Sequence, residues 1–277
     1  MTHEYRFSDA TGYSFAQLSE MHNASFSGYF FPMAMTSEST ADFWRTSQID
    51  ANRCVVMHDQ AGMFVGMARM GTRGKRGWCG GFGIVPEFRG RGASNVLAAQ
   101  MVQVARDSGL ASLQLEVLTQ NVRAIKTYES AGFVTTRRLF GLEIETQALS
   151  ESVVSTSSFA PETLLPWLQN AAQPDWRREL MTLLTMGVEA VIAAGPDGRV
   201  NGLMVERAGE WVRIHGALLQ SQLTDAQLAA LLRQAAGDAR RIQIFNEPEG
   251  SPFLARCRQL GFTEFYSQYE MFHPLSV

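Results

Sequence analysis

The sequence predicts a mixed α/β (α+β) fold made of two tandem copies of one unit, each a mixed, mostly antiparallel sheet flanked by helices. Short runs with strand-like alternation are interleaved with segments of helical periodicity, in a similar order in both halves of the chain. The pair Gly132-Phe133, which follows a short helix, recurs as Gly261-Phe262 in the second half. We therefore expect two domains, at residues 1–146 and 147–277.

The first half begins with a short strand, two helices and three strands. Phe15, Leu18 and Met21 recur at helical spacing in the first helix. Glycine-containing turns at residues 59–62 and 71–74 separate the three strands. In order, these elements are expected at Glu4–Phe7, Ser14–Ser25, Thr40–Ile49, Cys54–Met57, Met63–Met70 and Trp78–Val85.

A helix, a strand and a second helix complete the first half. Leu97, Met101 and Val104 recur at helical spacing, and Gly109 is a typical stop signal after such a helix. The strand Ser112–Leu118 alternates apolar and polar residues. A short helix follows at Val122–Ala131, and Phe133 begins another strand.

The second half repeats this order after a Ser- and Thr-rich stretch, residues 147–161, which suits a linker or an exposed crossover strand. A Gly-Pro-Asp-Gly turn then joins two strands into a hairpin. The expected elements are the strands Val188–Ala194, Val200–Glu206 and Trp211–Leu218, a helix at Asp225–Ala239, the strand Ile242–Phe245 and a short helix before Gly261.

The composition is that of a globular protein without a strong overall charge. Apolar residues make up 45% of the 277 residues, and the formal net charge of −3 predicts no general attraction to nucleic acid or membranes. Cys54, Cys79 and Cys257 form no CxxC pair, so neither a disulfide framework nor a metal site is expected. Without a signal peptide or an apolar run long enough to span a membrane, the sequence predicts a cytoplasmic protein.

Arginine and glycine alternate in the segment GIVPEFRGRGASN, residues 83–95, where a strand meets the following helix. The start of a helix presents unpaired backbone N–H groups and the positive end of the helix dipole, and glycine lets the backbone approach an anion closely. Between Arg69 and Arg91 there are six basic residues and one acid, Glu87. The loop is therefore a candidate site for phosphate or pyrophosphate.

Other interpretations of this loop are open at this point. An exposed turn with solvated arginines has the same composition, and a nucleic-acid patch is also basic. A Walker loop is excluded, because Gly74-Lys75 is followed by Arg76 and not by Ser or Thr. A dinucleotide fingerprint is excluded, because Gly81-Phe82-Gly83 leads to Pro86.

Two motifs together resemble the GNAT superfamily of acetyl-CoA-dependent N-acetyltransferases. In RGRGAS, Arg89 and Gly92 match the Arg/Gln-x-x-Gly-x-Gly/Ala loop of that superfamily, while Ser94 replaces the usual last Gly or Ala. The second motif, Asn121-x-x-Ala124-x-x-x-Tyr128-x-x-x-Gly132-Phe133, follows in the right order and on the expected helix.

A third segment narrows the resemblance to one group of the superfamily. Arg73–Trp78, with the two glycines that follow it, is similar to a bacterial group of tandem-domain GNAT proteins. The resemblance covers residues 1–146, whereas the second half is similar only in topology. It implies two tandem GNAT-like domains, the first of them catalytic.

The resemblance implies acetyl-CoA as cosubstrate and no metal. The loop amides would hold the pyrophosphate of the coenzyme, the strand before the loop would pair with its pantetheine arm, and a backbone amide of that strand would polarise the thioester carbonyl. The coenzyme-binding residues carried over from the family are Gly83, Ile84, Val85, Arg89, Gly90, Arg91, Gly92, Ala93, Ser94 and Asn121.

Two catalytic residues are also implied. Tyr128 matches the general acid that protonates the departing thiolate, and Glu116 lies where several N-acetyltransferases keep a general base. Each has a structural alternative, because Tyr128 would also suit the core and Glu116 a solvated strand face. The aromatic residues within 26–31, together with Trp44, either line an acceptor pocket or belong to the core.

The second copy lacks the features that carry the chemistry in the first. At the corresponding helix start, Thr224 and Gln227 predict a capping box, and Asp225 puts a negative charge where a pyrophosphate would sit. Cys257 takes the place of Tyr128 and is expected to be a buried structural thiol. Residues 147–277 are therefore expected to form a degenerate, non-catalytic domain that closes the acceptor site or builds a dimer.

The sequence as a whole predicts an N-acetyltransferase that moves an acetyl group from acetyl-CoA to an amine by direct attack in a ternary complex. The alternative is a catalytically weak acyl-CoA-binding sensor or partner-binding module. The expected acceptor is a small molecule or a peptide, with no nucleic-acid or membrane partner, and a homodimer is left open. The identity of the acceptor and the preferred acyl chain do not follow from the residues.

Overall fold

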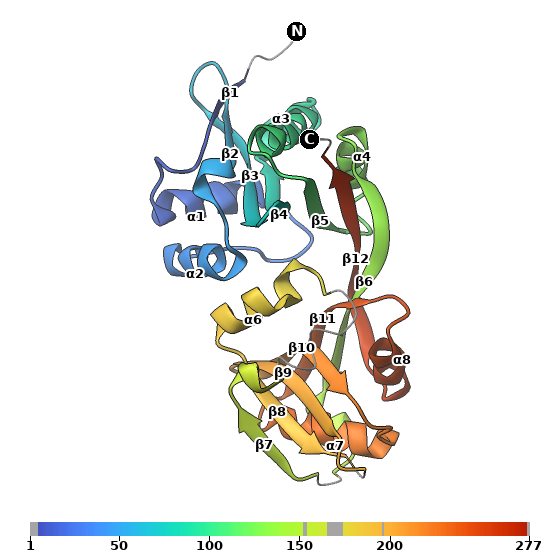
Figure 1. Cartoon of the computed structure of the whole chain (residues 1–277). Helices are drawn as coiled ribbons and strands as arrows, with labels where there is room; N and C mark the ends of the chain where they lie inside the picture. Colours follow the sequence, from blue (N-terminus) through green and yellow to red (C-terminus); the bar gives the residue numbers. More distant parts are fainter. Residues whose placement is uncertain (1–4, 152–153, 165–173, 196, 276–277) are drawn as a thin grey trace. The chain divides into compact units, whose positions relative to one another are not determined.

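The computed structural model describes residues 5–151, 154–164, 174–195 and 197–275. The chain divides into two compact units, which Figure 1 colours along the sequence. Unit 1 comprises residues 1–136 and 269–277, and unit 2 comprises residues 137–268.

This division differs from the boundary expected after residue 146. Residues 139–145 pair with a strand of unit 2, from Leu139↔Pro248 to Glu145↔Arg241. The last residues of the chain return to unit 1, where the backbone N–H of Leu275 donates to Ala111 O at 2.9 Å. A contiguous boundary was expected because sequence repeats give no information on which sheet a terminal strand joins.

Unit 1 contains strands in the order β1-β2-β3-β4-β5-β12. Strands β1 to β4 pair antiparallel in this order, whereas β4 and β5 run parallel from Arg76↔Ser112 to Trp78↔Gln114. The two strands then diverge. The elements are β1 Arg6–Ser8, α1 Phe15–Ser25, α2 Ser37–Ser47, β2 Val55–His58, β3 Phe64–Arg73, β4 Arg76–Ile84, α3 Ala93–Asp107, β5 Ser112–Leu118, α4 Val122–Ser130 and the end of β12 Thr263–Pro274.

The helices of unit 1 pack on both faces of its sheet. On β2, Val55 and Met57 belong to the core cluster that contains α3, whereas the intervening Val56 belongs to the cluster that contains α1 and α2. Successive strand residues point to opposite faces, so α3 and the α1–α2 pair cover opposite faces. Helix α2 begins before the expected Thr40, because Thr36 forms a capping box with Ser39.

Unit 2 repeats this plan with strands in the order β12-β6-β11-β10-β9-β8-β7. Strands β10 and β11 pair parallel from Trp211↔Arg241 to Ile214↔Ile244 and then diverge, as β4 and β5 do in unit 1. The elements are β6 Val134–Glu145, β7 Thr156–Phe159, α6 Leu180–Met186, β8 Glu189–Ala194, β9 Val200–Ala208, β10 Trp211–Leu219, α7 Asp225–Ala236, β11 Arg241–Pro248 and α8 Pro252–Gln259.

Most elements of unit 2 agree with the sequence, with two differences. Helix α7 ends at Ala236, three residues before the expected end, and Gly237 follows with a positive φ of 57°. Helix α6 was not expected. The Ser- and Thr-rich stretch contains the edge strand β7, in agreement with a crossover strand, while residues 152–153 of that stretch lie outside the described residues.

The described chain contains seven α-helices around mixed strands, which confirms the mixed α/β (α+β) fold. None of the helices in the described residues has the length and hydrophobicity needed to cross a membrane. Within the same residues, His, Cys, Asp and Glu side chains form no cluster of three or more suited to a metal ion.

Candidate active site

Unit 1 contains a cavity of about 480 Å³ beside the gap between β4 and β5. Its walls come from the end of α1 and the loop after it, the end of β4, the start of α3 and the start of α4. The carboxyl ends of diverging parallel strands are a usual place for ligands in α/β proteins. The cavity brings together the Arg/Gly loop, Asn121 and the end of β4, three of the regions that the sequence singled out.

The Arg/Gly loop presents uncapped backbone amides at the start of α3. Gly90 and Gly92 have positive φ angles of 74° and 83°, and a Cβ on either would meet nothing within 4 Å. Gly92 is the N-cap of α3 and provides no side-chain cap. No side chain therefore caps the first backbone N–H groups of α3 in the described residues. An uncapped helix start of this kind suits an anion.

The side chain of Arg89 makes three hydrogen bonds within unit 1. Its guanidinium donates to Ile84 O at 2.8 Å, to Ser25 O at 2.9 Å and to Ser27 O at 2.8 Å. These bonds tie the loop to the end of β4 and to the end of α1. The side chain therefore positions the loop, while Arg91 is exposed and open to a ligand.

Ser94 also contacts protein through its side chain. Its hydroxyl lies 3.2 Å from the hydroxyl of Thr127, which joins the first turn of α3 to α4. A ligand would therefore meet Ser94 through its backbone, and Ala93 is buried. Serine in place of the usual Gly or Ala at residue 94 thus adds a hydrogen bond between α3 and α4.

The end of β4 has one edge free for a ligand. Gly83 and Ile84 pair with Met67 and Gly66 of β3, and the Val85 N–H donates to Val65 O at 2.9 Å. The opposite edge faces the gap, because β5 has already diverged. A Cβ on Gly83 would approach the Ser25 Cβ to 2.6 Å, so glycine is required for the packing of α1 against β4.

Asn121 begins α4 and contacts an aromatic residue that the sequence did not assign to this site. Its side chain accepts from the Ala124 N–H at 3.3 Å as an N-cap. It also lies near the Tyr29 hydroxyl: burial raises the pKa of Tyr29, and the Asn121 side chain acts against that rise. Tyr29, with Phe26 and Phe30, lines the cavity. No local signal marks this contact, because the two residues are distant in sequence.

Some of the aromatic residues singled out in the first half therefore line a pocket, and others belong to the core. Phe26, Tyr29 and Phe30 line the cavity, and Phe30 is 49% exposed. Trp44 is buried and belongs to the core under α1 and α2.

Tyr128 is buried in the core and does not line the cavity, although its neighbours Phe82 and Thr127 do. Its ring makes edge contacts with Phe82, at a centroid distance of 5.4 Å, and with Phe133, at 5.9 Å. Burial raises the pKa of Tyr128 well above its ordinary value, and the nearby Cys79 adds to the effect. The hydroxyl is therefore protonated at neutral pH, which is the form that donates a proton or a hydrogen bond.

Glu116 lies on β5 and is held by a tryptophan of β4. Its Oε2 accepts a hydrogen bond from Trp78 Nε1 at 2.8 Å. Burial raises the pKa of Cys79 to about 11, and the charge of Glu116 contributes to that rise. Cys79 also contributes to the raised pKa of Tyr128, so both Glu116 and Tyr128 lie within electrostatic range of this residue of β4.

A buried arginine under β4 was missed by the sequence analysis. Arg69 is 3% exposed, and its guanidinium lies 4.8 Å from the centre of the Phe43 ring. It fills the space where a side chain at Gly81 would be. Burial lowers the pKa of His22 to about 4, and the charge of Arg69 adds to this. A single arginine in an alternating strand gives no sign of such burial.

The corresponding helix start in unit 2 is closed. Thr224 and Gln227 form the predicted capping box, with the Gln227 N–H donating to the Thr224 hydroxyl at 3.2 Å. Asp225 pairs with Arg256 at 2.9 Å. Cys257 is buried, and burial raises the pKa of its thiol.

The sequence model of the Acetyltransferase (GNAT) family matches residues 15–133. These residues belong to the GNAT family. The match contains the Arg/Gly loop, the diverging strands β4 and β5, and helix α4 up to Phe133. The GNAT resemblance of the sequence is thereby confirmed, and membership in this family supports acyl transfer as the general activity.

Solved structures show the GNAT fold across the whole chain. A tandem GNAT protein from the clavulanic acid biosynthesis pathway is similar with a TM-score of 0.70 and 13% identity, over 99% of each chain. A GCN5-related N-acetyltransferase from Sphaerobacter thermophilus has a TM-score of 0.67 and 13% identity, over 99% of this chain and 96% of that one. One from Anabaena variabilis has a TM-score of 0.65 and 14% identity, over 99% and 73%. A comparison with curated proteins gives no match.

Proposed function

We propose that unit 1 transfers an acetyl group from acetyl-CoA to an amine, by direct attack in a ternary complex. The observation that carries the proposal is the start of α3, which has no side-chain cap and follows the positive-φ glycines 90 and 92, beside a cavity of about 480 Å³. An anionic pyrophosphate suits this uncapped helix start, and the gap between β4 and β5 suits a thin, uncharged arm.

The proposed coenzyme contacts use the backbone amides of the Arg/Gly loop and the unpaired edge of β4. The amides of Gly90, Arg91, Gly92, Ala93 and Ser94 would bind the pyrophosphate, with the exposed Arg91 side chain adding charge. The free edge of β4 at residues 83–85 would pair with the pantetheine arm, next to Asn121. Arg89 would act indirectly, by holding the loop against α1.

The proposed reaction forms a C–N bond and breaks a C–S bond. The acceptor amine must lose a proton to attack, and Glu116, held by Trp78, would accept it directly or through water. A backbone N–H of β4 would stabilise the oxyanion of the tetrahedral intermediate. The protonated Tyr128 hydroxyl would donate to the departing thiolate. The acceptor is a small molecule or a peptide that carries an amine.

We also propose that unit 2 is non-catalytic. Its helix start satisfies its own amides, its first residue is the acid Asp225, and Cys257 takes the place of the tyrosine. A thiol whose pKa is raised by burial is a poor nucleophile and a poor replacement for a tyrosine acid.

An assay of thiol release tests the proposal. The protein is mixed with acetyl-CoA and a panel of small amines and peptide N-termini, and the free thiol is measured. We expect release that depends on one or more amines. Binding of acetyl-CoA without amine-dependent release would contradict transfer and would favour an acyl-CoA-binding sensor.

A further inference from the structure

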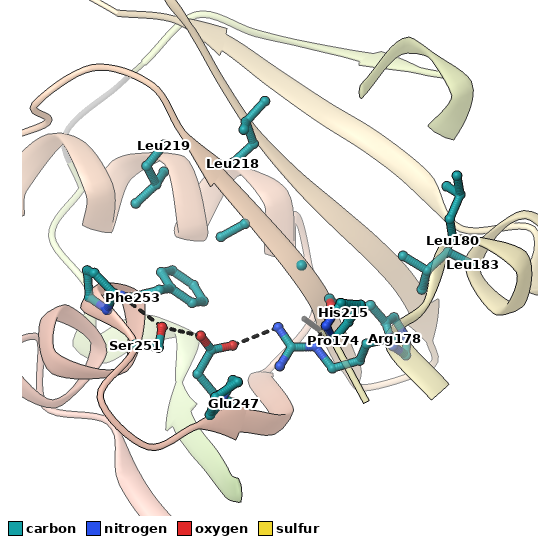
Figure 2. Close-up of a pocket in the computed structure, with 14 residues that line it drawn as sticks. Pro174, Arg178, Leu180, Leu183, His215, Leu218, Leu219, Glu247, Ser251 and Phe253 are labelled. Atoms are coloured by element: carbon teal, nitrogen blue, oxygen red, sulfur yellow. Dashed lines mark hydrogen bonds and ion pairs between the residues drawn. The ribbon is translucent and has the colours of Figure 1, made fainter. Parts of the chain in front are cut away.

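Unit 2 holds a cavity of about 530 Å³ beside the gap between its parallel strands. Pairing of β10 with β11 stops at Ile214 and Ile244, and the strands continue separately to Leu219 and Pro248. Residues from both strands, from α6 and from the first turn of α8 line the cavity, as Figure 2 shows. Its size is within the range of small-molecule sites.

A buried arginine joins the two separated strands inside this gap. Arg178 Nε donates to His215 O at 2.6 Å, and its terminal nitrogens donate to Asn246 O and to Glu247 Oε2, both at 2.7 Å. Glu247 also accepts from the Ser251 hydroxyl. The side chains of Arg178 and Glu247 are 9% and 6% exposed. Protein therefore fills the inner end of the gap, which in unit 1 is the proposed channel for the coenzyme.

The charged groups around this end of the cavity balance. Glu206 accepts from His215 Nε2 at 3.0 Å and lies 3.5 Å from Arg213. Burial lowers the pKa of His215, so the ring is neutral at pH 7. Among the described residues that line the cavity, the set that carries charge at pH 7 is Arg178 and Glu247, which pair with one another.

This balance selects against a charged ligand. An ion that enters a partly desolvated site loses hydration, and here it would find no unmatched charge in the set to compensate that loss. An uncharged ligand avoids the cost. Arg178 carries more N–H groups than its three acceptors use, so a carbonyl oxygen can still accept a hydrogen bond from it.

The remaining walls are apolar and come from three elements. They are formed by Leu180, Leu183, Ala217, Leu218, Leu219 and Phe253. In Figure 2, Leu180 and Leu183 lie apart from Leu218 and Leu219, with Arg178 and Glu247 drawn below the two β10 leucines. Such walls favour an aliphatic body on the ligand, since burial of apolar surface is favourable.

We propose that this cavity binds an uncharged small molecule with an aliphatic body and a carbonyl group, of the class of aliphatic amides. The carbonyl oxygen accepts from Arg178, and the aliphatic part contacts the leucines of α6 and β10. Acyl-CoA does not bind in this cavity.

Methyl NMR of the full chain with labelled leucines tests the proposal, with hexanamide, hexanoate and hexylammonium as probes of matched length. We expect hexanamide to shift the methyl signals of Leu180, Leu183, Leu218 and Leu219, and to leave those of the unit 1 core unchanged. Hexanoate and hexylammonium are each expected to bind at least about tenfold more weakly than hexanamide.

A charge switch provides the sharper test. Glu247→Gln keeps an oxygen acceptor for Arg178 but leaves one positive charge unbalanced, so hexanoate should now bind more tightly than hexanamide. The matched control is Glu264→Gln, which removes the same charge from an exposed pair with Arg258 and should not change the order of affinity.

Three results would overturn the proposal: no shift of the four leucine methyls by any probe, hexanoate binding to the unaltered protein as tightly as hexanamide, or displacement of hexanamide by acetyl-CoA from these leucines. The methyl spectrum shows whether Glu247→Gln folds. If it does not fold, the proposal is judged from the unaltered protein alone, by whether hexanamide binds more tightly than hexanoate and hexylammonium.

Discussion

The indole N–H of Trp78 donates a 2.8 Å hydrogen bond to Glu116 Oε2, from β4 to β5. Trp78 belongs to the last parallel pair of the two strands, with Gln114, and Glu116 lies two residues further along β5. The bond therefore fixes a carboxylate where the strands begin to diverge. A general base needs such a fixed orientation toward its substrate.

Replacing Glu116 with Gln should lower kcat/KM by about 10²-fold or more, because the amide still accepts from Trp78 but cannot take a proton. Trp78→Phe is the comparison, since it keeps the carboxylate and removes only its hydrogen-bond donor. An unchanged rate for Glu116→Gln would show that Glu116 is not the base.

Tyr128→Phe should lower kcat by about 10²-fold with little change in the KM for acetyl-CoA. The phenyl ring preserves the edge contacts with Phe82 and Phe133, so the loss is confined to the hydroxyl. Steady-state kinetics with the amine that gives thiol release measures both constants. Equal turnover by the two proteins would make Tyr128 a core aromatic only.

The geometry of the Arg/Gly loop was predictable from the sequence because it rests on local features. Glycine at residues 90 and 92 provides positive φ angles, and the absence of a capping side chain leaves amides uncapped. The capping box of Thr224 was predictable for the same reason. The contacts of Arg89 with Ser25 and of Asn121 with Tyr29 were not, because they join residues far apart in the chain.

The stability of unit 1 should fall as pH decreases from about 6.5 to 4, in part through His22. Its pKa is about 4 in the folded protein, lowered by burial, whereas the unfolded chain binds the proton near pH 6.5. The unfolded state thus gains protons first, which costs up to about 3 kcal/mol of folding free energy at pH 4. His22 Nε2 lies 2.6 Å from Met33 O, to which it donates as neutral imidazole.

Urea unfolding of the unaltered protein and His22→Gln at pH 7, 6 and 5 measures this contribution. The difference in unfolding free energy between the two proteins should shrink as pH falls, because glutamine does not titrate. A difference that stays constant with pH would contradict the lowered pKa of His22.

Arg178→Met should destabilise the protein by about 3–5 kcal/mol, because it leaves the Glu247 carboxylate buried without its partner. The double variant Arg178→Met with Glu247→Leu should recover most of this loss, since neither charge remains. Arg258→Met, in an exposed pair with Glu264, is the control and should change the unfolding free energy by about 0.5 kcal/mol or less. A single variant as stable as the control would show that the buried pair contributes nothing.

The helices and strands of the second half were largely predictable from the sequence, but the contacts between residues distant in the chain were not. Alternation and turn residues located β8, β9 and β10 to within a residue or two. The cavity of unit 2 depends on Arg178, which precedes a helix that no periodicity indicated. The return of residues 269–277 to unit 1 depends on strand pairing across the whole chain, which local patterns do not record.

Calorimetric titration with acetyl-CoA tests the central claim, that the open helix start of unit 1 binds the coenzyme. Gly92→Glu puts a carboxylate in the loop, and Gly62→Glu is the matched control, because both glycines have a φ of 83° and open space at the Cβ. We predict one acetyl-CoA per chain for the unaltered protein and for Gly62→Glu, and no binding for Gly92→Glu. Equal binding by the two variants would contradict the account.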